Sequence, residues 1–414
     1  MKGGIYMIIF LRKILKYKYY GVIMVIVICI GCAHEATAVL ADEALHLYST
    51  GYALTDGRTG RVLMGKNETS PMANASTTKI LTCIIALENC ALNERVTISA
   101  YAAAQPKVRL GMAEGEVYTL KDLLYGLMLE SYNDCAVAIA EHIAGSVEGF
   151  ADVMNQKAVE IGCENTYFLT PNGLDAEKGE EFHHTTAIDL CKIMKYCVWE
   201  SPQKEAFLKI TQTKEYSDSL GTRTYTFINR NALLDQIDGL LSGKTGYTAK
   251  AGYCYVAAYE KNGERYCVAL LACGWPNNKT WKWIDTAKIL NYAVNNYDMK
   301  KVTIQQIKEQ LVVDGYVSPP QFSMLNKNDI LEIIGEQQEY TLLLGEGEEI
   351  IKEVVLYRNV SLPIDKKQEM GVCNIYVEDM LLDVIPLVSN TESGEWNLSN
   401  IMYVILCQFF TFSS

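Results

Sequence analysis

The stretch NASTTKILTCIIALENC, Asn74 to Cys90, combines the pattern of a buried helix with a first turn that does not suit one. Its apolar residues recur at the helical period of about 3.6 residues and so form one apolar face for a core. A helix start favours acidic residues, because it exposes unpaired N–H groups and the positive end of the helix dipole. Here Ser76 is followed three residues later by Lys79, so the cation needs a chemical reason.

A serine three residues before a lysine places a hydroxyl and an amine on the same helical face, within hydrogen-bond reach. The positive helix end, burial and a nearby second cation each disfavour the protonated amine, and a neutral lysine can accept the hydroxyl proton. The pattern predicts Ser76 as a nucleophile and Lys79 as its base, with backbone N–H groups of the helix start facing an oxyanion. Alone the spacing is weak, because a capping serine beside a solvated lysine gives the same match.

Two further motifs add to this pattern. Ser131-Tyr132-Asn133 lies in a predicted corner between the helices TLKDLLYGLMLE and NDCAVAIAEHIAG, and Asn133 is expected to cap the second helix, which stops at Gly145. Lys244-Thr245-Gly246 lies on a predicted strand, GLLSGKTGYT. The order Ser-x-x-Lys, Ser-x-Asn, Lys-Thr-Gly is that of the penicillin-recognising serine enzymes.

The region from Tyr48 to Tyr297 closely resembles the low-molecular-mass D-alanyl-D-alanine carboxypeptidases of peptidase family S11. The resemblance rests on the stretches ASTTKILTCIIALE, LKDLLYGLMLESYNDCAVAIAEHIAG, TPNGLD, HHTTAIDL and GKTGYTAKAGYC. It implies an enzyme that removes the terminal D-Ala from peptidoglycan stem peptides ending in D-Ala-D-Ala, needs no cofactor and is acylated by β-lactams. It further implies that Ser76 is the acylated nucleophile, that Lys79 is its base and that Ser131 relays a proton.

The same resemblance implies the substrate contacts. Asn133 would bind the substrate amide, and Lys244 with Thr245 would hold its terminal carboxylate. Gly246 belongs to the same substrate-binding strand, and the backbone N–H of Tyr247 would complete the oxyanion hole with that of the nucleophile. No metal ligand is implied.

Several positions depart from the family pattern. The family usually has Pro at the place of Asn74, a small residue at that of Tyr132 and Tyr at that of His184, and none of these changes is expected to disable the site. His183 matches a family histidine, as a site residue or equally as a packing or capping residue. Arg230 either assists carboxylate recognition or ties down a loop, and the loop role is favoured.

The expected fold is α+β. A β-lactamase/transpeptidase-like catalytic domain builds one antiparallel sheet from its two terminal segments and holds an all-helical insertion between them. A small all-β domain and a C-terminal amphipathic helix follow. The expected boundaries are 1–41 for a signal peptide, 42–297 for the catalytic domain, 298–390 for the β-rich domain and 391–414 for a membrane-anchoring tail. The segment before Lys244 is two residues longer than the common family form, which leaves the register of that strand open.

The first forty residues and the overall charge restrict location and partners. Arg12, Lys13, Lys16 and Lys18 precede the apolar run GVIMVIVICIG, Gly21 to Gly31, which is the pattern of an export signal. The catalytic region is therefore expected outside the cytoplasm, on the outer face of the cytoplasmic membrane.

The net charge of −12 and the lack of a Lys/Arg block argue against nucleic-acid binding.

Thirteen cysteines in an exported chain could indicate disulfides, but their number is odd and their spacing forms no framework. A two-residue hairpin at Asn262-Gly263 would pair Ala258 with Cys267. Cys254 would then lie on the same face about 13 Å from Cys267, beyond disulfide reach. Most cysteines are therefore interpreted as small buried apolar residues. No C-x-x-C or H-E-x-x-H pattern predicts a metal.

The tail EWNLSNIMYVILCQFFTFSS, Glu395 to Ser414, is amphipathic at 100° per residue. Its amides and Thr411 share one narrow sector with Val404, and its aromatic and aliphatic residues surround the rest. Its length is marginal for a bilayer span, so the pattern favours a helix lying at the membrane surface. Packing on the β-rich domain or at a dimer interface is the alternative.

Two rival functions share part of this pattern. A serine β-lactamase needs a second base to hydrolyse its acyl-enzyme, which one large class supplies from a Glu-x-x-x-Asn segment, and none occurs between Asn133 and Lys244. A non-catalytic peptidoglycan-binding or sporulation protein of the same fold has no need for the complete set of motif residues. Release of D-Ala from a D-Ala-D-Ala peptide separates the two, because a peptidase releases it and a binding protein does not.

Overall fold

The computed structural model describes residues 45–220, 223–313, 316–318, 329–357, 363–394 and 402. The expected signal peptide and, apart from its first residues and Met402, the expected tail lie outside these residues. The chain forms two compact units, one ending at Asn295 and the other starting at Asn296.

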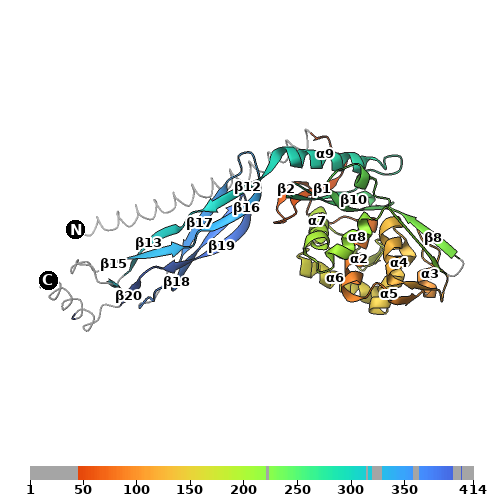
Figure 1. The fold of residues 1–414 in the computed structure, drawn as a ribbon, viewed down its shortest axis with the longest axis horizontal. Helices are drawn as coiled ribbons and strands as arrows, with labels where there is room; N and C mark the ends of the chain where they lie inside the picture. The colour runs from red at the N-terminus through yellow and green to blue at the C-terminus, as the bar shows by residue number, and fades with distance from the viewer. Residues whose placement is uncertain are drawn as a thin grey trace. The chain divides into compact units, whose positions relative to one another are not determined.

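The first unit is built on a five-stranded antiparallel sheet whose strands come from both ends of the unit. These strands are β1 (Gly51–Asp56), β2 (Val62–Lys66), β9 (Leu240–Thr248), β10 (Gly252–Lys261) and β11 (Glu264–Leu271). Their order is β2-β1-β11-β10-β9, so β9 is an edge strand. The helix α9 (Trp281–Asn296) covers one face, and the helices between β2 and β9 lie on the other, as Figure 1 shows. This is the predicted arrangement of sheet and helical insertion.

The inserted region supplies most of the core. Its helices are α2 (Lys79–Asn89), α3 (Ala100–Ala103), α4 (Leu120–Tyr125), α5 (Asn133–Ala144), α6 (Val147–Ile161), α7 (Ala187–Lys195) and α8 (Lys204–Gln212), with the short turns η1 (Ala75–Thr78), η2 (Gly126–Glu130), η3 (Tyr196–Glu200) and η4 (Ala232–Asp235). Ile80, Leu81, Ile84 and Ile85 of α2 are fully buried in this core, which confirms the apolar face read from the sequence.

Helix boundaries follow the predicted signals with one correction. Thr119 and Asp122 form the expected capping box of α4, and Gly145 ends α5 in the left-handed conformation. The predicted cap of α5 was wrong, because Tyr132 occupies the N-cap position and Asn133 makes no capping bond. The amide of Asn133 is turned instead toward Lys79. Asn133 therefore bonds Lys79 in place of the backbone at the start of α5.

The hairpin between β10 and β11 has the predicted register. Ala258 pairs with Cys267, and Lys261 pairs with Glu264 across the turn. Asn262 and Gly263 both have positive φ, which the tight turn requires. All ten cysteines of the described residues are free thiols, and eight of them are buried.

Sequence reasoning missed several elements between α2 and β9. Besides α8, they are the short antiparallel pairs β3 (Arg95–Thr97) with β4 (Val117–Thr119), β5 (Glu177–Lys178) with β6 (Glu181–Phe182), and β7 (Glu215–Leu220) with β8 (Arg223–Ile228). The open register before the Lys-Thr-Gly motif is resolved by an irregularity: Ser242 pairs with Ala258 and Leu240 with Tyr259, so Leu241 has no partner opposite. This bulge accommodates one extra residue before Lys244, and Lys244 itself pairs with Val256.

The second unit is built from β-strands between Tyr297 and Gly394. Its strands are β12 (Tyr297–Ile304), β13 (Ile307–Val313), β14 (Tyr316–Ser318), β15 (Asp329–Gly335), β16 (Gln338–Gly345), β17 (Ile350–Leu356), β18 (Glu369–Val377), β19 (Met380–Ser389) and β20 (Glu392–Gly394). They form a five-stranded antiparallel sheet in the order β13-β15-β19-β18-β17 and two smaller pairs. Leu331, Ile333, Cys373, Ile375 and Leu387 are the centre of its core.

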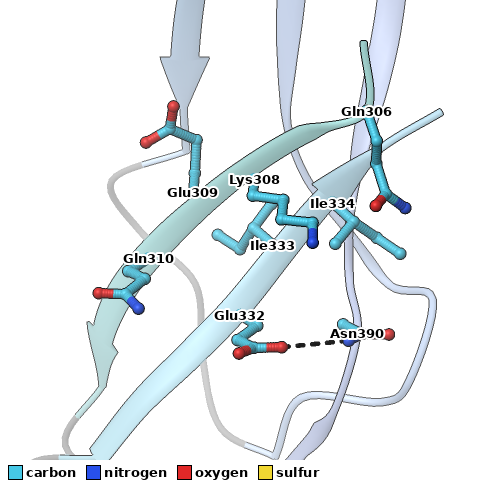
Figure 2. Close-up of a pocket in the computed structure, with 8 residues that line it drawn as sticks. All are labelled: Gln306, Lys308, Glu309, Gln310, Glu332, Ile333, Ile334 and Asn390. Atoms are coloured by element: carbon cyan, nitrogen blue, oxygen red, sulfur yellow. Dashed lines mark hydrogen bonds between the residues drawn. The ribbon is translucent and has the colours of Figure 1, made fainter. Parts of the chain in front are cut away.

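A polar hollow of about 530 Å³ lies beside β13 and β15 (Figure 2). Lys308 and Gln310 of β13 face it together with Glu332, whose carboxylate accepts a hydrogen bond of 3.2 Å from the Asn390 amide. None of the motif residues lies in this hollow.

Candidate active site

Ser76 lies in the short turn η1, directly before α2, and its backbone is tightly fixed. The preceding residue, Ala75, has φ 50°, a conformation that a non-glycine residue adopts only where its surroundings impose it. The Asn74 amide donates to the hydroxyls of Thr77 (3.0 Å) and Thr78 (2.8 Å). The Asn74 side chain thus holds the turn at the position where the family usually has Pro.

Lys79, the first residue of α2, is fully buried beside Ser76. Its Nζ lies 2.9 Å from Ser76 Oγ, 3.0 Å from Asn133 Oδ1 and 2.6 Å from the backbone oxygen of Asn172. Burial and then the positive charge of Lys244 hold the pKa of Lys79 well below its usual value. The lysine in the first turn of the helix is therefore explained, because its surroundings favour the neutral amine over the protonated one.

The three partners of Lys79 suit a neutral amine. The oxygens of Asn133 and Asn172 are amide carbonyls and can only accept, and the two N–H bonds of a neutral amine satisfy both. The lone pair is then left for the Ser76 hydroxyl, the one partner that has a proton to give. The arrangement can therefore draw the proton from the nucleophile.

Ser131 occupies the predicted corner between η2 and α5 and has φ 67°. Its hydroxyl accepts a hydrogen bond of 2.9 Å from Lys244 Nζ, which also donates to the backbone oxygen of Thr245. Lys244 is buried on β9, and burial lowers its pKa to about 7. Ser131 therefore lies beside a second amine whose proton is easily exchanged near neutral pH.

The edge strand β9 lies directly against the turn that carries Ser76. A side-chain carbon added at Gly246 would come within 2.9 Å of the backbone nitrogen of Ser76 and the backbone oxygen of Asn74, so only glycine fits here. Thr245 and Tyr247 flank this glycine. An edge strand has backbone groups free to pair with an extended peptide.

A pocket of about 310 Å³ brings the motif residues together. It is lined by Ser76, Lys107, Val108, Ser131, Asn133, Leu174, Arg230, Thr245, Gly246, Tyr247, Tyr253, Lys282 and Trp283. Of the predicted site residues, only Lys79 and Lys244 are absent from the lining, because both lie buried beneath it. Among these described lining residues none is acidic and three are cationic, so the pocket suits an anionic ligand.

Comparison with known proteins identifies the family. Residues 37–273, more than half of the chain, match the family described as D-alanyl-D-alanine carboxypeptidase, Peptidase_S11. The chain belongs to the D-alanyl-D-alanine carboxypeptidase family. It is a serine-type peptidase and a member of the penicillin-binding proteins, which confirms the predicted enzyme class.

Relatives of this carboxypeptidase cover most of its length. The D-alanyl-D-alanine carboxypeptidase DacF of Bacillus subtilis is 29% identical, over 86% of this chain and 88% of its own. In fold, the carboxypeptidase DacD of Francisella tularensis matches 84% of this chain and 94% of its own, with a TM-score of 0.65 and 23% identity. Penicillin-binding protein D2 of Listeria monocytogenes, solved in a cefotaxime-bound form, is 25% identical over 59% of this chain and 96% of its own, with a TM-score of 0.50.

Arg230 has the favoured role of tying down a loop, and its role in carboxylate recognition stays a prediction. Its Nε donates to the Glu130 carboxylate at 2.8 Å, and the other Glu130 oxygen accepts from the Ile228 backbone N–H. Glu130 directly precedes Ser131 and is buried, so the pair ties the strand end at β8 to the serine corner of the carboxypeptidase. The guanidinium also lines the pocket.

Lys107, Tyr253, Lys282 and Trp283 line the pocket without having been predicted. Lys282 Nζ lies 4.7 Å from the ring centre of Tyr253 and 4.4 Å from that of Trp283. Burial lowers the pKa of Lys282 to about 8. No motif marks these residues, since Lys107 comes from a loop, Tyr253 from β10, and Lys282 and Trp283 from α9, and only the fold brings these segments to the pocket.

His183 hydrogen-bonds Thr78 in the turn η1, which carries Ser76, and does not line the pocket. Its Nδ1 accepts from the backbone N–H groups of Leu169 (3.0 Å) and Thr170 (3.3 Å), so the ring proton is on Nε2. Nε2 then donates to Thr78 Oγ1 at 2.9 Å, and the Thr78 hydroxyl donates to the backbone oxygen of Ala75. Burial lowers the pKa of His183 to about 3, so it stays neutral.

Replacing His183 with phenylalanine is expected to slow acylation and to lower the free energy of unfolding at pH 7 by about 2 kcal/mol or more, because two backbone donors lose their acceptor. The folded-state pKa lies below the unfolded value, so the contribution of His183 is present above pH 6.5 and is lost as the pH falls toward 3. Chemical unfolding between pH 4 and 8 measures the difference from wild type, which should shrink toward low pH.

His184→Phe is the matched control, since the His184 ring nitrogen Nδ1 lies 2.6 Å from the Phe182 backbone oxygen, whereas His183 bonds Thr78 in the turn that carries Ser76. A stability difference for His183→Phe that stays constant across this pH range, or an acylation rate equal to that of the control, contradicts the assigned support.

Proposed function

We propose that this enzyme is a serine D-alanyl-D-alanine carboxypeptidase that removes the terminal D-Ala from peptidoglycan stem peptides through an acyl-enzyme on Ser76. The observation that carries the proposal is the 2.9 Å contact between Ser76 Oγ and Lys79 Nζ, an amine whose pKa burial holds well below its usual value. In the acylation step Lys79 takes the hydroxyl proton while Ser76 Oγ bonds to the penultimate D-Ala carbonyl.

The C–N bond to the terminal D-Ala then breaks, and the leaving amine needs a proton. Ser131 relays that proton from Lys244, since Lys244 Nζ donates to Ser131 Oγ at 2.9 Å and has a pKa of about 7. Lys79 then releases to solvent the proton that it took from Ser76, and Lys244 regains one from solvent, so that both amines return to their starting state. The negative charge on the carbonyl oxygen is stabilised by the backbone N–H groups of Ser76 and Tyr247. Water next hydrolyses the ester, which releases the shortened peptide and restores the Ser76 hydroxyl.

Substrate recognition rests on the charge of the pocket and on the edge strand. Lys244 and Thr245 hold the free carboxylate of the terminal D-Ala, and Asn133 binds the substrate amide. Support comes from the absence of acidic side chains among the described lining residues and from the position of β9 beside Ser76. β-Lactams mimic the acyl-D-Ala-D-Ala bond and are proposed to acylate Ser76; the Listeria relative solved with cefotaxime bound supports β-lactam binding by this family.

The biological consequence is a limit on cross-linking, because a stem peptide without its terminal D-Ala no longer acts as a donor for transpeptidation. A serine β-lactamase is disfavoured because no carboxylate lines the described part of the pocket to activate water on the acyl-enzyme. A non-catalytic binding protein is disfavoured by the buried amine set, which binding alone does not need.

The test is release of D-Ala from diacetyl-Lys-D-Ala-D-Ala by the purified full-length protein, followed by a coupled assay for free D-Ala. We expect turnover that a fluorescent penicillin blocks with one label per chain. Binding of the peptide without D-Ala release overturns the peptidase proposal, and rapid multiple-turnover hydrolysis of penicillin without peptide turnover favours the β-lactamase.

We also propose that the enzyme acts on the outer face of the cytoplasmic membrane and that its tail, from Glu395 to Ser414, attaches it there. The expected start of the tail at residue 391 is corrected, because Glu392–Gly394 form strand β20. No helix among the described residues has both the length and the hydrophobicity to cross a bilayer. The attachment proposal therefore rests on the amphipathic sequence of the tail alone.

The signal-cleaved protein is expected to sediment with liposomes with little dependence on salt or lipid charge, because no Lys or Arg follows Lys367 and binding relies on apolar burial. Truncation after Ser393 should leave the protein in the supernatant with unchanged D-Ala release. Full-length mature protein that stays in the supernatant rules out the anchor, and a truncated protein that still sediments places the lipid contact elsewhere.

A further inference from the structure

Three different metal-ligating side chains meet at the far end of the nucleophile's helix. They are Cys90, Glu94 and His142, whose ligand atoms all lie within 4.8 Å of one another. His142 Nε2 lies 3.0 Å from Glu94 Oε2. Two zinc–ligand bonds of about 2.1 Å at a tetrahedral angle separate their ligand atoms by about 3.4 Å, so only small side-chain shifts are needed to fit the ion.

We propose that Cys90, Glu94 and His142 form a binding site for Zn²⁺, with water as the fourth ligand. A thiolate, an imidazole and a carboxylate are the ligand types that zinc prefers, and thiolate with imidazole selects against Mg²⁺ and Ca²⁺. The thiolate and the carboxylate together balance the charge of the ion. The site is independent of the proposed reaction.

The backbone around the site favours a cation. Cys90 is the residue at which α2 ends, and His142 lies in the last turn of α5. The negative ends of two helix dipoles therefore converge on one point. The Ala91 backbone N–H donates to Glu94 Oε1 at 2.6 Å, which fixes the carboxylate and leaves Oε2 facing His142. Such an orienting bond is typical of a metal-ligating carboxylate.

Solvent reaches the site. The His142 and Glu94 side chains are 25% and 41% exposed, and Cys90 is partly buried. Zinc can thus enter without local unfolding, and a water can complete the coordination. Sequence patterns did not predict this cluster, because Glu94 and His142 are 48 residues apart and match no metal motif.

The site acts as a clamp between two helices that carry the reaction. α2 begins with Lys79 and α5 begins with Asn133, and these two residues are joined at 3.0 Å. The same two helices carry Cys90 and His142 at their other ends. A bound ion would join the helices at both ends and stabilise their packing against thermal unfolding.

The experiment uses the full-length protein in detergent, reduced, stripped of metal and then freed of chelator. Equilibrium dialysis against ZnCl₂ measures affinity, thermal melting measures stabilisation, and CoCl₂ reports on a thiolate ligand through its sulfur-to-cobalt charge-transfer absorption. The variants are Cys90→Ser and His142→Asn. Cys163→Ser is the matched control, because Cys163 is also partly buried beside the carboxylate of Asp189, but Lys192 pairs with that carboxylate.

We expect zinc to bind wild type and Cys163→Ser equally, to raise the melting temperature of both, and to bind at least tenfold more weakly to Cys90→Ser and His142→Asn. The cobalt charge-transfer band should disappear in Cys90→Ser alone among the cysteine variants. No saturable zinc binding by wild type, or equal binding by all four proteins, overturns the site and leaves only an ion pair between His142 and Glu94. Any zinc binding by cysteines outside the described residues is the same in every variant. The test does not use D-Ala release, so its result is independent of the proposed enzyme activity.

Discussion

Replacing Ser76 with alanine is expected to abolish both D-Ala release and covalent labelling by a fluorescent penicillin. The loss in turnover should approach a millionfold, the order seen when the nucleophile of a serine peptidase is removed. The reason is that Ser76 Oγ is the hydroxyl 2.9 Å from the buried amine, and β-lactams and peptides acylate the same oxygen. Labelling, read as a fluorescent band in a gel, is the sharper measurement because it needs a single turnover.

Ser219→Ala is the control for this variant, since Ser219 is an exposed serine on β7 away from the pocket residues. It should label and turn over like wild type. An undiminished fluorescent band from Ser76→Ala would show that the nucleophile is another residue, with Ser131 the first to examine. Circular dichroism of the variant confirms that a lost band does not reflect unfolding.

Replacing Lys79 with arginine is expected to slow acylation by about 10²- to 10⁴-fold, the contribution of a positioned general base. Arginine keeps the positive charge but does not lose its proton at any accessible pH, so no lone pair faces Ser76 Oγ. Wild-type acylation should rise with pH through the lowered pKa of Lys79, and the arginine variant should lack this limb. Stopped-flow acylation by a chromogenic β-lactam between pH 5 and 10 measures both effects.

Lys157→Arg is the matched control, because Lys157 is a partly buried lysine on α6 that forms ion pairs with Glu88 and Glu160. Its acylation rate and pH profile should equal those of wild type. If Lys79→Arg acylates at a near wild-type rate with an unchanged pH profile, Lys79 is structural and the base is another group. A thermal melt separates loss of the base from loss of the fold, since the larger guanidinium must fit a fully buried site.

The candidate site was predictable where chemistry is local in the sequence. Ser76 and Lys79 are one helical turn apart, so their contact follows from helix geometry once the helix is recognised. Their juxtaposition with Ser131 and Lys244 follows from motif order only through the family resemblance. Asn172 could not be predicted, because it contributes a backbone oxygen to Lys79, and a backbone atom has no sequence signature.

The open alternatives were decided by packing. His183 is a support of the turn because its two ring nitrogens are both occupied by buried partners, which no linear pattern reveals. Asn133 does not cap α5: Tyr132 is the N-cap residue, and the Asn133 amide oxygen accepts a hydrogen bond from Lys79. Arg230 both ties the corner and lines the pocket, since one guanidinium can reach Glu130 and still face solvent.

The sequence by itself determined the elements whose signals are local: the apolar face of α2, the capping box at Thr119, the stop at Gly145 and the register of the Asn262-Gly263 hairpin. These depend on side-chain periodicity and on backbone preferences of a few neighbouring residues. Only the tertiary structure decided which groups far apart in the sequence are buried together, away from water. Lys79 and Lys244 are 165 positions apart, yet their pKa values fall because the fold buries both amines beneath one pocket, and burial is a property of the whole packed chain.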